Sequence, residues 1–141
     1  MNAHVPSSVA ATLPEASDPA SIAFRGAMRK LAGAVSVLTV GQGDARTGLT
    51  ATSVSSLSVD PPTLLISVNR KASAYGALLS ERTFAINVLR PHHQQLADRF
   101  AGRDGVNGAA RYAGAEWTRL STGAPVLADA LSVFDCELED A

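Results

Sequence analysis

The sequence has one cysteine, modest charge and no long apolar run, and each shortage excludes a class of protein. Cys136 is the only cysteine among 141 residues, which excludes an intramolecular disulfide and a cysteine-rich zinc site and favours the reducing cytoplasm. The apolar stretches have the length of strands, so no membrane partner is expected. Twelve Lys and Arg against thirteen Asp and Glu give a net charge of −1. This balance supplies no basic field for a nucleic acid.

The amino-terminal stretch lacks large hydrophobic residues and the basic and apolar regions of a signal peptide. Residues 1–20 are rich in Ala, Ser, Pro and Thr, and we predict a flexible tail there without a catalytic part. One domain is expected over residues 21–141, because this length suits a single core and hydrophobic residues make up 46% of the chain.

Hydrophobic periodicity predicts a mainly β, antiparallel domain with a few short helices. A glycine-rich turn over residues 41–46 favours antiparallel pairing of its flanking strands. A barrel is the expected architecture, because closure removes exposed sheet edges. Strands are expected at residues 35–40, from Thr47 through the hydroxyl-rich run to Ser58, at 63–68 (buried on both faces or closed in a barrel), at 83–89 and at 133–138, and helices from an N-cap at Ser21 to about Ala32, after a cap at Ser73, and over His93–Phe100.

Several standard sites are excluded or disfavoured. Gly41-Gln-Gly43 does not extend to a dinucleotide-binding GxGxxG, because Arg46 takes the place of the third glycine. His92 and His93 are adjacent, so their side chains are expected to point in different directions, which favours a surface or helix-start role over a metal site. Cys136 lies in an apolar strand and is expected to be a small buried hydrophobe, not a nucleophile.

Two polar segments are candidates for ligand binding. Small and hydroxyl-bearing residues recur between Thr50 and Ser58, where they would let a flat ring approach the backbone. The turn Asn69–Ser73 carries two cations and a serine before a predicted helix, so a phosphate could sit between Ser56 and this turn. The alternatives stay open at this point: outward-facing strand hydroxyls need no ligand, and Arg70 and Lys71 could form a solvated turn.

Seven stretches in a fixed order resemble the short-chain flavin reductase family, whose members have the FMN-binding split-barrel fold. They are Phe24–Met28, Gly33–Thr39, Gly48–Ser58, Asp60–Asn69, Phe84–Leu89, Leu96–Gly102 and Gly123–Leu127. Each stretch is a weak motif alone, but their order and spacing together are specific, and the stretches are spread over the chain from Phe24 to Leu127.

The resemblance implies a Greek-key-like split β-barrel that binds FMN or FAD and passes hydride from NADH or NADPH to the flavin. Members work as homodimers and supply reduced flavin to a separate monooxygenase. No catalytic side chain is nominated, because the cofactors carry the hydride chemistry and the protein places them. The implied cofactor-binding residues are Thr50, Ala51, Thr52, Ser53 and Val54 at the isoalloxazine, Ser56, Leu57, Lys71, Ala72 and Ser73 beside the ribityl chain and phosphate, and Phe100 and Arg103 in a pocket-closing segment, with Arg103 the main contact there.

In the family, the strand that matches residues 133–138 continues into a Gly-x-His segment that helps to hold the nicotinamide, and then into further strands. This sequence ends at Ala141, before that segment, so we expect a fragment or a shortened homologue. A flavin-binding module without reductase turnover is therefore the alternative function. A pyridoxamine-phosphate-oxidase-like or haem-handling split barrel is a third. The choices between NADH and NADPH, and between FMN and FAD, stay open.

Overall fold

The computed structural model describes residues 18–141. Contacts divide the chain into an amino-terminal unit that contains helix α1, Pro19–Met28, and a larger unit, residues 33–141. Asp18, not Ser21, is the N-cap of α1: its carboxylate accepts the Ser21 amide at 3.2 Å, and Pro19 takes the first helical position. The expected tail lies outside the described residues except for 18–20, which form this cap and first turn. None of the described helices is long and apolar enough to cross a membrane.

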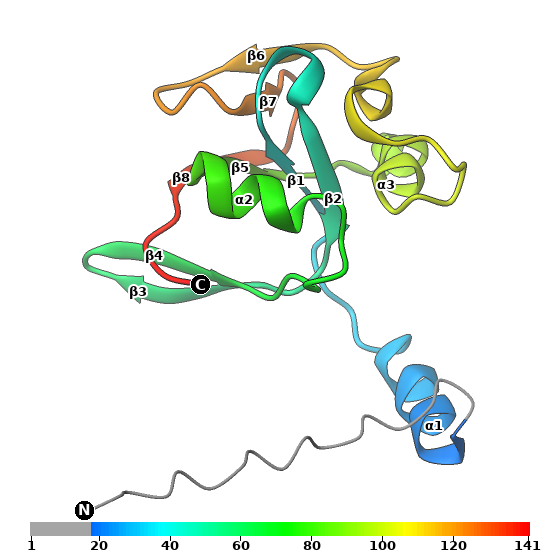
Figure 1. Cartoon of the computed structure of the whole chain (residues 1–141). Coiled ribbons are helices and arrows are strands. Elements are labelled where there is room, and N and C mark those ends of the chain that lie inside the picture. Colours follow the sequence, from blue (N-terminus) through cyan, green and yellow to red (C-terminus); the bar gives the residue numbers. More distant parts are fainter. Residues whose placement is uncertain (1–17) are drawn as a thin grey trace, which may run out of the picture. The chain divides into compact units, whose positions relative to one another are not determined.

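A four-stranded antiparallel sheet forms the centre of the larger unit (Figure 1). In spatial order its strands are β2 (Thr47–Ala51), β1 (Ser36–Val40), β5 (Thr83–Val88) and β8 (Ser132–Glu137). Two further ladders pair β3 (Val54–Val59) with β4 (Pro62–Ile66), and β6 (Trp117–Arg119) with β7 (Pro125–Leu127). The α-helices are α2 (Tyr75–Glu81) and α3 (Gln94–Phe100), and the 3-10 helices are η1 (Gly43–Ala45), η2 (Pro91–His93) and η3 (Gly108–Tyr112). The predicted mainly β, antiparallel class with short helices is confirmed.

Both faces of the sheet are covered, and for this reason β1 is buried at all five positions. Alternate residues of a strand point to opposite faces, so β1 contributes to two separate cores. One core lies under α2 and contains Leu38, Val40, Ala74, Leu78, Phe84 and Ile86. The other lies under α3 and η3 and contains Val37, Leu96, Phe100, Tyr112 and Leu127.

Strand β7 is fastened to the sheet by two buried polar side chains, Asn87 and Thr39, which are both 0% exposed. The Asn87 amide group donates to the Val37 carbonyl and to the Thr39 hydroxyl, each at 3.1 Å, and its oxygen accepts the Leu127 amide at 2.8 Å. The Thr39 hydroxyl donates to the Pro125 carbonyl at 2.5 Å. Buried polar groups need such partners, so the polar residues inside β1 and β5 serve as cross-links.

Three expectations about the strands are wrong. The hydroxyl-rich run is two strands, because the chain breaks at Thr52 and Ser53 and passes from the β2 ladder into the β3 ladder. The strand expected at residues 63–68 ends at Ile66 and leaves Leu65 53% exposed. The reason is that β4 pairs only with β3 within residues 18–141. The sequence also predicts no strand at residues 125–127, where side chains from other strands hold β7 in place.

Candidate functional site

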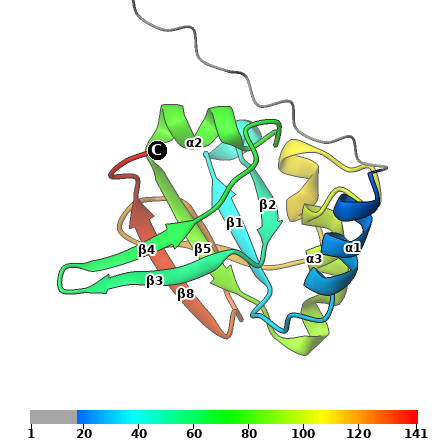
Figure 2. The same ribbon diagram turned by 90° about the horizontal axis from the view of Figure 1, so that it is seen from below.

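The predicted site begins where β2 ends and the β3–β4 hairpin begins. The Ser53 hydroxyl donates to the Ser67 carbonyl at 2.9 Å, and the Ser67 amide donates to the Ser53 carbonyl at 3.4 Å. From Ser67 the chain runs directly into the turn at residues 69–73. The pairing of the hairpin therefore brings residues 52–54 and the turn to the same end of the hairpin, as the ribbons in Figures 1 and 2 show.

Asn69 shapes this turn from within. Its side-chain oxygen accepts the Lys71 amide at 2.9 Å, and its carbonyl accepts the Ala72 amide at 2.8 Å. The expectation that Ser73 caps α2 is wrong, because α2 starts after Ala74 and has no side-chain cap. Within residues 18–141 the side chains of Arg70, Lys71 and Ser73 make no hydrogen bond or ion pair, and all three residues are exposed.

Ser56 and Leu57 lie on β3, at a bulge. The register of β3 against β4 shifts between Ser56 and Ser58, so Leu57 has no partner residue and is 64% exposed. The hydroxyls of Ser56 and Thr52 have no hydrogen-bond partner within residues 18–141. Hydroxyl and cationic donors without partners, close to one hairpin, fit an anionic ligand such as a phosphate ester.

Thr50 and Ala51 have structural roles in the isolated chain. The Thr50 hydroxyl donates to the Ala97 carbonyl of α3 at 2.6 Å, so it is already engaged and ties β2 to α3. Ala51 is 6% exposed at the end of β2. Of the hydroxyls at residues 50, 52 and 53, only that of Thr52 has no partner within residues 18–141.

Phe100, the last residue of α3, packs this helix against β2. Its ring is 1% exposed and packs on Gly48, where an added Cβ would lie 2.8 Å from the ring and 2.2 Å from the Leu38 carbonyl oxygen. The Phe100 side chain is therefore buried in the single chain, and its contact with the cofactor stays a prediction. Arg103 lies just beyond the helix, is exposed, and pairs with Asp98.

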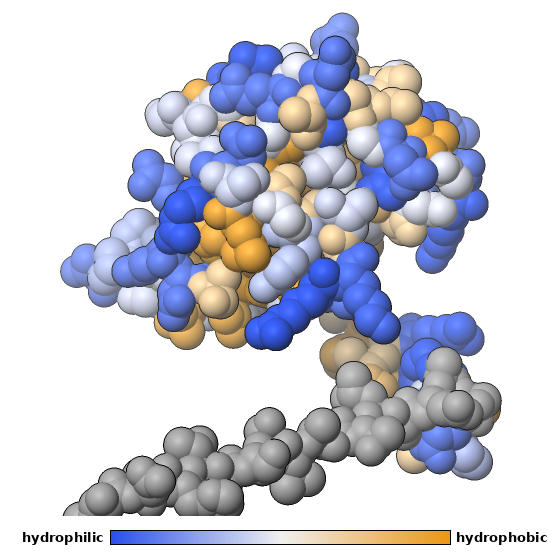
Figure 3. All heavy atoms as spheres, viewed as in Figure 1, coloured by the Kyte–Doolittle hydropathy of each residue, from blue (hydrophilic) through white to orange (hydrophobic). Residues whose placement is uncertain are grey.

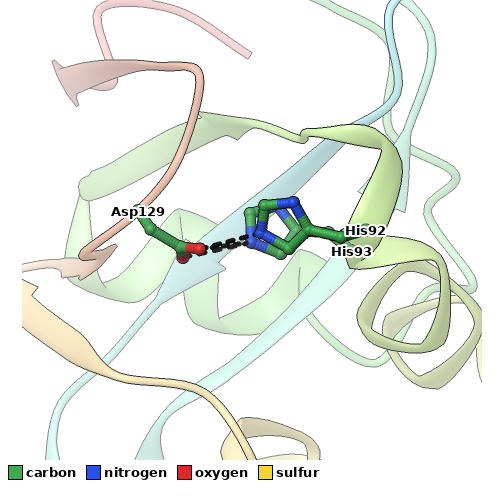
Figure 4. A group of neighbouring side chains, drawn as sticks. All are labelled: His92, His93 and Asp129. Atoms are coloured by element: carbon green, nitrogen blue, oxygen red, sulfur yellow. Dashed lines mark hydrogen bonds and ion pairs between the residues drawn. The ribbon is translucent and has the colours of Figure 1, made fainter.

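His92 and His93 both point at Asp129, as Figure 4 shows. The Nε2 atoms of the two rings lie 2.9 and 3.1 Å from the carboxylate oxygens, and the ring centroids are 4.1 Å apart. The expectation that adjacent histidines diverge is wrong here, because the tight 3-10 turn η2 brings the two rings to one side. The hydrogen bonds from His92 and then His93 hold the pKa of Asp129 below its ordinary value.

The hydrogen bonding of the His92–His93–Asp129 cluster favours a structural cross-link over a metal site. The Arg90 amide donates to Nδ1 of His93 at 3.0 Å, so the neutral ring carries its proton on Nε2 and donates it to Asp129. A cation on Nε2 would need the lone pair that this proton occupies. The cluster thus ties η2, at the start of α3, to the segment that follows β7.

Two grooves lie beside the His92–His93–Asp129 cluster, and neither is lined by a predicted cofactor-binding residue. One has a volume of about 370 Å³ between Val35, Leu89 and the start of α3. The other, of about 580 Å³, lies beside His92, Gln95 and Glu116. Most of the predicted flavin residues are exposed in the single chain, namely Thr52, Ser53, Ser56, Leu57, Lys71, Ser73 and Arg103.

Cys136 lies in β8, as predicted, and is only half-buried against the core under α2. Burial, with a smaller contribution from the Asp135 charge, raises the pKa of its thiol. A raised pKa keeps the sulfur protonated near neutral pH, which disfavours a role as a nucleophile.

Comparison with known proteins decides the family. Residues 28–141 match the family described as "Flavin reductase like domain". The chain belongs to the flavin reductase-like family. Among its relatives is a protein of Methylorubrum extorquens (strain PA1) named FMN reductase (NADH) RutF 2, which is 51% identical over 127 residues, or 88% of this chain and 73% of that protein.

Other members of the flavin reductase-like family match at greater distance. FMN reductase (NADH) RutF 1, from a second strain of Methylorubrum extorquens, is 47% identical over 116 residues, or 82% of this chain. The chain spans 57% of the length of that relative. Among solved structures, BorF, the flavin reductase component of a bacterial two-component tryptophan halogenase, superposes with a TM-score of 0.76 at 36% identity, over 85% of this chain and 75% of BorF. The predicted flavin reductase split-barrel fold is thereby confirmed.

Proposed function

We propose that this protein is an NADH-dependent flavin reductase that takes FMN as its flavin. The observation that carries the proposal is the set of donors without partners beside the base of the β3–β4 hairpin: Ser56, Lys71 and Ser73. Ser56 lies in one of the stretches that resemble flavin reductases, and Lys71 and Ser73 come shortly after another, which ends at Asn69. The relatives named FMN reductase (NADH) support the choice of FMN and NADH.

In this proposal, different residues bind the phosphate, the ring and the ribityl chain of the flavin. Lys71, Ser73 and Ser56 bind the phosphate through charge-assisted and hydroxyl hydrogen bonds. Residues 50–54 place the ring, since small side chains allow it to approach the backbone. Ala72 and Leu57 contact the ribityl chain, and Arg103 contacts the flavin from the segment after α3. FMN supplies the acceptor for the hydride of NADH, and these residues bind and orient it.

A second copy of the chain completes the site in this proposal. The β3–β4 hairpin exposes Leu57, Val59 and Leu65, at 64%, 87% and 53%. Figure 3 shows apolar surface gathered over this hairpin and the neighbouring α2. Exposed apolar surface of this kind favours an interface, and a homodimer would turn the open flavin surface into a pocket.

The reduced flavin serves a partner enzyme, for which we propose a flavin-dependent monooxygenase in the cytoplasm. The solved relative BorF supports a role in a two-component system, because it is the flavin reductase component of a two-component tryptophan halogenase. The single cysteine fits a reducing compartment.

The test is the oxidation of NADH and of NADPH, followed with and without added FMN. We expect FMN-dependent oxidation that is faster with NADH. Binding of FMN without any nicotinamide oxidation would replace the reductase with a flavin-binding module. Absence of both would overturn the proposed function.

A further inference from the structure

Arg111, at the end of η3, is a buried cation whose contacts are all to neutral oxygen atoms. The residue is 6% exposed. Its guanidinium group donates to the carbonyls of Gly48 and Val106, at 2.7 and 2.8 Å, and to the side-chain oxygen of Asn107 at 3.2 Å. It forms no ion pair within residues 18–141. Burial of a charge without a carboxylate is costly, and three neutral oxygen atoms offset part of that cost here by accepting its hydrogen bonds.

Residues 102–107, the segment after α3, lie beside this guanidinium group. Gly102 begins the segment with a left-handed backbone, φ +77°, and a Cβ there would lie 3.6 Å from Nη2 of Arg111. Val106 and Asn107 end the segment and accept hydrogen bonds from the same group. The Arg111 side chain therefore holds the end of a loop that carries Arg103, and its Nη2 lies beside the start of that loop at Gly102.

The same side chain reaches the strand that leads to the flavin surface. Gly48 lies in β2, two residues before Thr50, and has no room for a side chain under the Phe100 ring. Its carbonyl accepts the shortest of the three Arg111 hydrogen bonds, at 2.7 Å. The planar fork of arginine can bond several carbonyls in fixed directions, which the ammonium group of lysine cannot reproduce.

We infer that Arg111 is a positioning residue for flavin binding: it fixes the Gly102–Asn107 loop, and with it Arg103, at a set place relative to β2. The inference rests on the proposed function, because its consequence is the affinity for FMN. Arg111 itself contacts protein atoms and holds the geometry in which Arg103 and residues 50–54 meet the flavin.

Three variants test the inference: Arg111→Met, Arg111→Lys and Tyr112→Phe. Tyr112→Phe is the matched control, because its hydroxyl donates to the Thr47 carbonyl at 2.5 Å, also from η3 to β2, without holding the loop. For each variant we would measure the dissociation constant of FMN by fluorescence quenching, KM and kcat with NADH, the unfolding midpoint, and hydrogen exchange of residues 102–107.

We expect Arg111→Met to raise both the dissociation constant and the KM for FMN by about tenfold, which corresponds to about 1.4 kcal/mol. Its kcat should stay within about twofold of the wild-type value. Arg111→Lys should recover part of the loss. The loop amides should exchange faster in both variants, whereas Tyr112→Phe should lower the unfolding midpoint and leave FMN affinity unchanged.

Equal loss of FMN affinity in Tyr112→Phe and Arg111→Met would overturn the inference, since it would reduce Arg111 to general stability. Unchanged affinity in Arg111→Lys, with the loop exchanging as in the wild type, would also overturn it. If Arg111→Met does not fold, the lysine variant and the exchange rates decide. Absence of FMN binding by the wild type would instead contradict the proposed function and the inference together.

Discussion

The central sheet and the β3–β4 hairpin are built from similar strands but are opposite in exposure. Strand β1 is buried at every position and is paired on both sides by β2 and β5. Strands β3 and β4 have only each other within residues 18–141 and are exposed or half-buried throughout. Inside the sheet, the Asn87 and Thr39 side chains hydrogen-bond to each other and to backbone groups, whereas Ser56 on the hairpin and Lys71 and Ser73 in the following turn have no side-chain partner within residues 18–141.

This contrast separates what holds the fold from what meets other molecules. Close packing on two faces leaves no space for a ligand around β1. The hairpin, with exposed leucine and valine on its strands and cations in the turn that follows, belongs to the surface that we propose for the flavin and for a second copy of the chain. Changes in the sheet should therefore alter stability first, and changes in the hairpin or turn should alter binding first.

The largest effect is expected for Gly48→Ala, at the edge of the sheet under Phe100. An added Cβ would lie 2.2 Å from the backbone oxygen of Leu38, so strand or helix must shift and the free energy of unfolding should fall by about 3 kcal/mol or more. The control is Gly76→Ala in α2, where nothing lies within 4 Å of the new Cβ. Chemical denaturation of both variants checks this. Equal stability of the two would contradict the account of the sheet.

A somewhat smaller loss is expected for Asn87→Ala. Truncation leaves the buried Leu127 amide without its acceptor and removes the donor to the Val37 carbonyl and the Thr39 hydroxyl, at a cost of about 2–3 kcal/mol in total. Because β7 depends on this cross-link, the β7 amides of the Asn87→Ala variant should exchange with solvent faster than its β1 amides. Hydrogen exchange measured by NMR would show it, and uniform exchange across β1 and β7 would contradict it.

On the hairpin, Leu57→Ser combined with Val59→Ser should shift the protein toward a monomer with little change in unfolding free energy. Both residues are exposed, at 64% and 87%, so the single chain loses little packing. Light scattering at several concentrations measures the shift. Leu120→Ser is the control, because Leu120 is 53% exposed outside the hairpin. A dimer that withstands the double change would place the interface elsewhere.

The smallest effect is expected at Cys136, on the border between the two regions. Because burial raises the pKa of its thiol, the reactive thiolate is scarce below that raised value. Alkylation by iodoacetamide at neutral pH should be several-fold slower in the folded protein than in denaturant. Mass spectrometry gives both rates, and equal rates would contradict a half-buried thiol.

Much of the sheet could be predicted from the sequence because its strands carry their own signal. Residues 36–40 and 83–88 are apolar and β-branched, and they form β1 and β5 within a residue or two of the expected bounds. The break of the hydroxyl-rich run could not be predicted, since Thr52 and Ser53 have the same strand propensity as their neighbours. The chain turns there because the two ladders diverge, which is a tertiary effect.

The candidate site followed from the sequence only through the resemblance and the exposed turn. At Phe100, sequence alone cannot tell a pocket-lining ring from one that packs on Gly48, so its packing needed the structure. The convergence of His92 and His93 on Asp129 needs a partner 36 residues or more away in the chain. Arg111 gave no signal either, because its partners are backbone carbonyls and an asparagine side chain, which no motif encodes.

The most direct test compares FMN with riboflavin, which lacks the phosphate, in the wild type and in the Lys71→Ala, Ser73→Ala double variant, with unfolding measured in parallel. Both side chains are exposed and without partners within residues 18–141, so stability should not change. The account predicts a loss of FMN affinity of about 1.5–3 kcal/mol with riboflavin affinity unchanged. Equal losses for the two ligands, or no loss for FMN, would contradict a phosphate site on this turn.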